Sequence, residues 1–249
     1  MRTANPALNS KIFENVRRTY ADANVMTIQG TVNRAALLLL LVVISATWTW
    51  TLAYTGDSAA VYPWLIVGAI GGLIVGFITI FKQNWAPITA PIYCLLKGLM
   101  LGGISAIFEA MYSGIVIQAV GLTFGTLFCL LAAYRTGLIK ATENFKRGVV
   151  AATGGIMIVY LVTFLLGLFG FHQIGFIHGS GLFGIGFSLF VVVIAALNLV
   201  LDFDFIETGA ARGAPKYMEW YAAFGLMVTL IWLYIEILRL LAKLAASRD

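Results

Sequence analysis

Residues 62–81 read YPWLIVGAIGGLIVGFITIF, a run of 20 residues that contains no Asp, Glu, Lys or Arg. A helix of about 20 apolar residues is long enough to cross the hydrocarbon core of a bilayer. The rest of the chain has the same character, since 61% of its 249 residues are hydrophobic and only 11% are charged. A soluble domain carries about 25% charged residues. The composition therefore excludes a soluble globular fold and predicts an integral membrane protein.

Six further apolar runs pass the same length test, which gives seven predicted transmembrane helices. They cover roughly residues 35–54, 62–81, 89–109, 114–134, 148–170, 180–203 and 218–242. The connections between them are short, so the sequence predicts one all-α transmembrane domain over residues 31–249. A polar, cytoplasmic N-terminal tail over residues 1–30 precedes it.

The placement of Lys and Arg predicts the orientation of the bundle. If the spans alternate, the tail and the connections that carry basic residues all lie on the side of the N-terminus. No Lys or Arg occurs in the connections of the other side, 55–61, 110–113 and 171–179. Basic residues accumulate on the cytoplasmic side, so we expect a cytoplasmic N-terminus. The last span does not fit this pattern, since it carries Arg239, Lys243 and Arg248 near the end that should lie outside the cell. Either the last helix tolerates basic residues at that end, or it does not cross the membrane fully.

Glycines at four-residue spacing mark predicted contacts between helices. Gly68, Gly72 and Gly76 share one face of the second span, and Gly98 and Gly102 share one face of the third. Small residues let helix backbones approach closely inside a membrane. We favour this packing role over that of a flexible hinge.

Ionisable residues inside the spans are the candidates for function, because a charge in the hydrocarbon region is costly. They are Lys97 in the third span, Asp202 and Asp204 at the end of the sixth, and Glu236 in the seventh. Lys97 and Asp202 enter from the same side, which predicts that they pair. Asp202 has a simpler reading as a helix-end carboxylate at the level of the headgroups. Glu236 has one too, as the structural partner of Arg239 one turn on.

Asp202 and Asp204 are two residues apart on a helix and therefore point about 200° away from each other. Only one of them can face the centre of the bundle, and the sequence leaves the choice open. If Asp202 faces inward, Asp204 and Glu207 lie on an outward face, near the cytoplasmic interface.

Two carboxylates in one buried site would titrate as a coupled pair. Their oxygens would suit a hard cation such as calcium. Asp202 and Glu236 therefore form a candidate cation site whose charge depends on pH. Depth argues against their meeting, because Glu236 lies about eighteen residues into the last span and Asp202 at the cytoplasmic end of the sixth. They meet only if the last helix begins well outside the membrane or the sixth dips inward.

The stretch LNLVLDFDFIETG (197–209), followed by LYIEILRLLAKL (233–244), resembles the end of the Bax inhibitor family of membrane proteins, in a bacterial branch. Four other stretches support the resemblance, in the family's order: ANPALNSKIFE (4–14), APIYCLLKGLMLGGISAIFE (90–109), GIVIQAVGLTFGTLF (114–128) and YRTGLIKATENFKRGV (134–149). The resemblance covers nearly the whole chain, although no single motif is a sharp fingerprint.

The resemblance implies seven helices, with the last wrapped by the other six. It also implies a pH-sensitive calcium leak channel in the bacterial inner membrane, with Asp202 and Glu236 as a carboxylate pair that shares a proton. This chain departs from the family pattern by having Glu236 in place of aspartate, a longer connection over residues 207–220, and Lys97 where an acidic residue is expected. The second span also lacks the arginine that would hold Asp202, a role that Lys97 is expected to take.

The main alternative is an interaction protein that regulates other membrane proteins, such as proteases, through its N-terminal tail.

We do not expect an enzyme, because His172 and His178 are the only histidines and neither they nor Ser180 belong to a catalytic motif such as HExxH. The expected partners are the lipid bilayer and calcium or protons, with calcium as the conducted ion and no other cofactor. The net charge of +5 reports orientation and does not indicate a nucleic-acid partner.

Overall fold

The computed structural model describes residues 24–55, 60–169, 179 and 181–247. Seven long helices in this part of the chain are apolar enough to cross a membrane. They are α2 (Ile28–Thr55), α3 (Val61–Phe81), α4 (Ala86–Met111), α5 (Ile115–Arg135), α6 (Glu143–Leu168), α8 (Leu182–Ala211) and α9 (Met218–Ala246), with a short turn η3 (Gln83–Trp85) before α4. They confirm the predicted all-α membrane fold and its seven spans.

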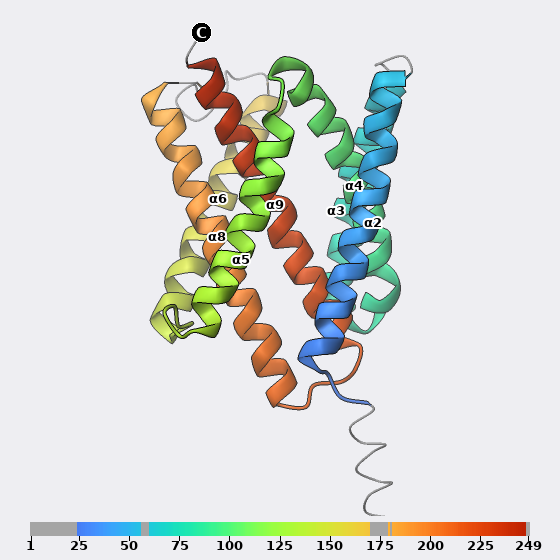
Figure 1. Cartoon of the computed structure of the whole chain (residues 1–249), viewed down its shortest axis with the longest axis vertical. Coiled ribbons are helices and arrows are strands. Elements are labelled where there is room, and N and C mark those ends of the chain that lie inside the picture. The colour runs from blue at the N-terminus through green and yellow to red at the C-terminus, as the bar shows by residue number, and fades with distance from the viewer. Residues whose placement is uncertain (1–23, 56–59, 170–178, 180, 248–249) are drawn as a thin grey trace, which may run out of the picture.

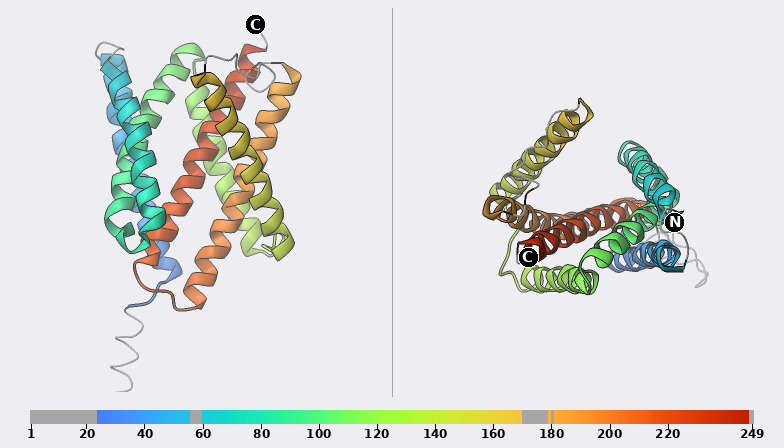
Figure 2. Two further views of the ribbon diagram at one scale, coloured as in Figure 1. Left: turned by 180° about the vertical axis from the view of Figure 1, so that it is seen from behind. Right: turned by 90° about the horizontal axis from the view of Figure 1, so that it is seen from above.

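Helix α9 is the central element of the bundle. It runs obliquely through the middle of the molecule (Figure 1), and the view along the bundle shows the other helices arranged around it (Figure 2). It packs directly against α2, α4, α5 and α8, and Tyr160 of α6 also reaches it. Helix α3 packs mainly on α4, so it covers α4 and forms an outer layer of the bundle.

Each helix runs the length of the bundle, so the first residue of α2 and the last residue of α9 lie at opposite ends of the molecule (Figure 1). We call the end where α2 begins the predicted cytoplasmic end. The helix α9 continues past its basic residues, which form hydrogen bonds and ion pairs inside the bundle. Lys243 is buried and donates hydrogen bonds to the Ser188 hydroxyl at 2.8 Å and the Gly184 carbonyl at 3.1 Å, both on α8.

The glycine faces lie where helices meet, as the sequence predicts. A Cβ atom at Gly98 would overlap Ser45 of α2, and one at Gly102 would overlap the backbone of Ala46. On the other side of α4, a Cβ at Gly68 of α3 would overlap the carbonyl of Leu96. The glycines therefore let α4 approach both α2 and α3 at backbone distance.

The connection between α8 and α9 holds the start of α2 at the predicted cytoplasmic end. The backbone N–H of Met26 donates to the carbonyl of Ala214 at 2.7 Å, and that of Lys216 donates to Asn24 at 2.9 Å. Met26 is buried and packs against Ile206. Most of the predicted tail, residues 1–23, lies outside the described residues, as do His172, His178 and Ser180.

Candidate functional site

Asp202 lies on the face of α8 that packs against α9. Its neighbours one turn away, Leu199 and Ile206, are buried on the same face. The carboxylate is adjacent to Thr229 of α9. Its Oδ2 atom is buried and has no hydrogen-bond partner in the described part of the chain. Asp202 is therefore the inward-facing member of the Asp202–Asp204 pair, and it holds a carboxylate oxygen that no donor satisfies.

Glu236 is the second carboxylate within the bundle, and its surroundings are different. It is 1% exposed, and Arg239 donates to both of its oxygens at 3.0 Å. The Tyr160 hydroxyl donates to Oε1 at 3.0 Å, and the Trp232 indole donates to the same oxygen at 3.3 Å. Arg239 also donates to the Tyr160 oxygen at 2.9 Å, which closes the network. The structure thus forms the Glu236–Arg239 pair that the sequence offers as the structural alternative.

The structure places Asp202 and Glu236 against the same helix but not against each other. Asp202 meets α9 at Thr229, and Glu236 lies seven residues further along α9, a rise of about 10 Å. Glu236 accepts hydrogen bonds from Tyr160, Trp232 and Arg239 and also interacts electrostatically with Lys243. Helix α9 begins at Met218, so it does not start far enough outside the bundle to bring the carboxylates to one level.

Asp204 and Glu207 point to neighbouring helices. Asp204 forms an ion pair with Lys146 of α6 at 2.7 Å. Glu207 accepts a hydrogen bond from the Tyr134 hydroxyl of α5 at 2.6 Å. Asp204 is 23% exposed in its side chain, which agrees with its expected position near the interface. Both carboxylates therefore hold α8 to its neighbours and leave Asp202 as the one directed to α9.

Lys97 does not pair with Asp202, contrary to the sequence-based expectation. Its side chain is half-buried between α3 and α4, where its methylene groups pack on Gly72. The ammonium lies 5.9 Å from the centre of the Tyr93 ring and 3.9 Å from the Met100 sulfur. Residue counting along the spans predicts the depth of Lys97 but not the direction of its side chain. The error lies in its direction, since this face of α4 is covered by α3.

Glu219 is a buried carboxylate that the sequence analysis did not identify. It is 0% exposed at the start of α9 and forms ion pairs with Arg34 of α2 at 2.8 Å and with Lys216 at 2.9 Å. The backbone N–H and the hydroxyl of Thr27 each donate to Oε1 at 2.9 Å. The carboxylate lies so close to Gly30 that a Cβ there would overlap it. We call Thr27, Arg34, Lys216 and Glu219 the entry cluster.

The available sequence signal for the entry cluster was positional. Arg34 directly precedes the first apolar run, and Glu219 is the second residue of the last. Both stand close to the same end of the predicted bundle. Trp220, the residue after Glu219, adds to the cluster, because the Arg34 guanidinium lies 5.3 Å from the centre of its ring.

The described residues contain no group of three or more His, Cys, Asp or Glu side chains that could hold a metal ion. A bound calcium ion takes six to eight oxygen ligands. The expected cation site of Asp202 and Glu236 is not assembled in this conformation, because Asp202 of α8 lies beside Thr229, about two turns of α9 away from Glu236. At Asp202 itself, one buried carboxylate oxygen has no hydrogen-bond partner among the described residues.

Residues 5–246 match the family model described as Bax inhibitor 1 like, which is nearly the whole chain. The chain belongs to the Bax inhibitor 1 like family. No curated protein matches it in a direct comparison. The seven helices of membrane-spanning length, with α9 at their centre, are the arrangement that the family resemblance implied.

The features by which this Bax inhibitor 1 like protein departs from the expected pattern have structural explanations. The longer α8–α9 connection pairs with residues 24–26 and carries Lys216 and Glu219 of the entry cluster. Glu236 has a longer side chain than aspartate and uses both oxygens on Arg239. Lys97 packs within the α3–α4 contact. Asp202 lies beside Thr229 of α9, while Glu236 pairs with Arg239.

Proposed function

We propose that this Bax inhibitor 1 like protein is a pH-sensitive leak for calcium ions. Asp202 is its pH-sensing carboxylate, at the seam between α8 and α9. The observation that carries the proposal is the buried Oδ2 of Asp202, which has no hydrogen-bond partner in the described part of the chain. The family match and the seven apolar helices support a membrane protein of this kind.

Asp202 suits a pH-dependent role because its charge is not fixed by a neighbour. An ionised carboxylate inside a bundle needs a cation, a donor or water. A change in its protonation therefore changes how tightly α8 and α9 can remain packed at Thr229, and how well the seam admits water and a cation. Asp204 and Glu207 already have partners on α6 and α5, so a change at either would act on a different helix contact.

Glu236 has a structural role in this proposal. Its charge is balanced by Arg239, and two neutral donors complete its hydrogen bonds. We propose that this network holds α9 to α6 while the seam near Asp202 responds to pH. The pair of carboxylates implied by the family resemblance is thus replaced by one responsive carboxylate and one fixed ion pair.

The experiment is a calcium-flux measurement with the full chain reconstituted in liposomes that contain a calcium-sensitive dye, over a series of pH values. The wild type should release calcium faster than protein-free liposomes, at a rate that varies with pH. Asp202→Asn should remove the variation with pH. Asp204→Asn makes the same chemical change two residues away, on the contact with α6, and should keep it.

A flux that Asp202→Asn leaves unchanged at every pH would contradict Asp202 as the sensor. Flux equal to that of protein-free liposomes would contradict the leak itself. That result would favour the interaction protein, whose predicted binding segment lies mostly in residues 1–23.

A further inference from the structure

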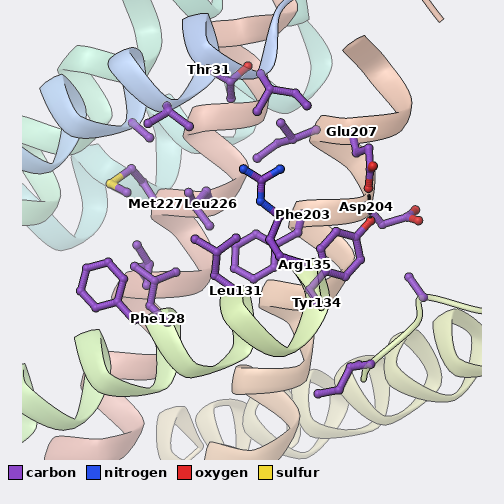
Figure 3. Close-up of a pocket in the computed structure, with 18 of the residues that line it drawn as sticks. Thr31, Phe128, Leu131, Tyr134, Arg135, Phe203, Asp204, Glu207, Leu226 and Met227 are labelled. Atoms are coloured by element: carbon purple, nitrogen blue, oxygen red, sulfur yellow. Dashed lines mark hydrogen bonds between the residues drawn. The ribbon is translucent and has the colours of Figure 1, made fainter. Parts of the chain in front are cut away.

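A large cavity opens on the side of the bundle between α2 and α5, at the predicted cytoplasmic end. Its volume is about 810 Å³, and α9 and the end of α8 form its inner wall. The close-up shows an inner surface of apolar side chains, among them Phe128, Leu131, Leu226 and Met227 (Figure 3). A second cavity of about 490 Å³ continues along α2 and α5, and the two share Leu39, Phe124 and other residues of their lining.

Arg135 is the exceptional side chain of the first cavity. Figure 3 shows its guanidinium extending into the cavity between α2 and α8. It forms no ion pair or side-chain hydrogen bond within the described part of the chain, although two carboxylates line the same cavity. These are Asp204, which pairs with Lys146, and Glu207, which accepts from Tyr134. The guanidinium thus remains available for an anion.

The dimensions of the cavity match one leaflet of a bilayer. Its lining on α5 runs from Phe124 to Arg135, eleven helical steps or about 16 Å along the helix. Half of the hydrocarbon core of a bilayer is about 15 Å thick. A cation at the end of an apolar cavity of this length fits an amphiphile with an anionic head at the membrane surface. A guanidinium also matches the geometry of a phosphate, to which it can donate two hydrogen bonds at once.

We infer that this cavity is a binding site for one anionic phospholipid. Its phosphate lies on Arg135, with Lys140 beside it at the mouth. Its acyl chains lie between α2 and α5 against α9. The predicted cytoplasmic leaflet is the one that carries anionic lipid. This inference does not depend on the proposed calcium leak, because it rests on the cavity and on Arg135.

The test is native mass spectrometry of the purified full chain, delipidated and then titrated with phosphatidylglycerol or phosphatidylcholine. The wild type should bind one phosphatidylglycerol more tightly than phosphatidylcholine. Arg135→Gln should weaken phosphatidylglycerol binding about fivefold, the factor that corresponds to one basic residue acting on an anionic lipid. Arg135→Lys should retain most of the preference.

Arg212→Gln is the matched control, because Arg212 caps the end of α8 that reaches the cavity but does not itself line the cavity. It should bind phosphatidylglycerol like the wild type. Ala36→Trp places a bulky side chain in the cavity from α2 and should weaken binding of both lipids.

Equal affinity of the wild type for the two lipids would overturn the assignment. So would equal losses in Arg135→Gln and Arg212→Gln, because binding would then follow net charge and not the cavity. Displacement of the bound lipid by inorganic phosphate alone would show that the acyl chains contribute nothing, which also contradicts it.

Discussion

Asp202 and Glu236 show how the surroundings of a buried carboxylate decide what it can do. Glu236 has a cation and two neutral donors within hydrogen-bond distance. Asp202 has a buried oxygen that no donor reaches in the described residues. Breaking a buried pair is costly because it leaves one charge uncompensated. Glu236 is therefore suited to stabilising the fold, and Asp202 is suited to responding to a change in pH.

We expect Glu236→Gln to destabilise the protein by about 1–3 kcal/mol, because Arg239 would keep its charge at a site that no longer balances it. Thermal denaturation in detergent would measure the change. Glu143→Gln is the control, since Glu143 also has a basic residue three positions on but its side chain is 77% exposed. A melting temperature as high for Glu236→Gln as for Glu143→Gln would contradict the structural role of Glu236.

Gly30 tests the entry cluster at the level of a single atom. A Cβ at this position would overlap the carboxylate of Glu219, so Gly30→Ala must displace that carboxylate from its partners. We expect a loss of about 1–3 kcal/mol, the cost of an unsatisfied buried polar group. Gly155→Ala on α6 is the control, because its Cβ meets no other atom within 4 Å.

Thermal denaturation of the two alanine variants decides the point. Gly155→Ala should be neutral or slightly stabilising, since alanine is the better helix former. If Gly30→Ala behaved in the same way, Glu219 would not be held at this site as the structure shows.

At the scale of the elements, the sequence predicts the helices well and their partners less well. An uncharged run such as 62–81 predicts the length of its helix directly, because the thickness of the bilayer sets the length of a membrane-spanning helix. The structure adds one to three turns at several ends, as where α8 continues to Ala211 beyond the predicted limit of 203. Those extra turns are polar and lie near the interface, where hydropathy no longer marks the helix.

Contacts between elements depend on the direction of each side chain around its helix, which depth alone does not give. Lys97 and Asp202 were expected to meet because they enter from the same side, yet α3 covers the face of α4 that carries Lys97. Glu219 was missed for the converse reason. It lies near a helix start, where a carboxylate usually reaches water, but α2 and its preceding segment bury it.

The α2–α4 contact gives a prediction at this scale. Gly102→Ala should destabilise the bundle, because a Cβ there would overlap the Ala46 carbonyl and push the two helices apart. Gly125→Ala on α5 makes the same chemical change in a place where the Cβ meets nothing within 4 Å. We expect a lower melting temperature for the first variant only. Equal melting temperatures would show that α2 and α4 are not packed at backbone distance.

At the scale of the whole molecule, seven membrane-spanning helices predict that the start of α2 and the end of α9 lie on opposite sides of the membrane. Labelling with a membrane-impermeant maleimide tests this in cells, after replacement of the native Cys94 and Cys129 by serine. A cysteine at Ser247, beyond α9, should react in intact cells. A cysteine at Thr136, which caps α5 at the predicted cytoplasmic end, should react only after permeabilisation. Labelling of both from one side would contradict the seven-span topology.

The central claim is that Asp202 acts alone as the pH-sensing group while the Glu236–Arg239 pair is structural. The most direct test is the pH profile of calcium flux for the double variant Glu236→Gln/Arg239→Gln, compared with Asp202→Asn, in the same liposomes. The double variant removes the charges of Glu236 and Arg239 together, so neither residue of the ion pair is left charged without the other. We predict that it keeps the wild-type dependence on pH and that Asp202→Asn loses it. Loss of the pH dependence in the double variant to the same extent as in Asp202→Asn would contradict the account and restore the coupled carboxylate pair.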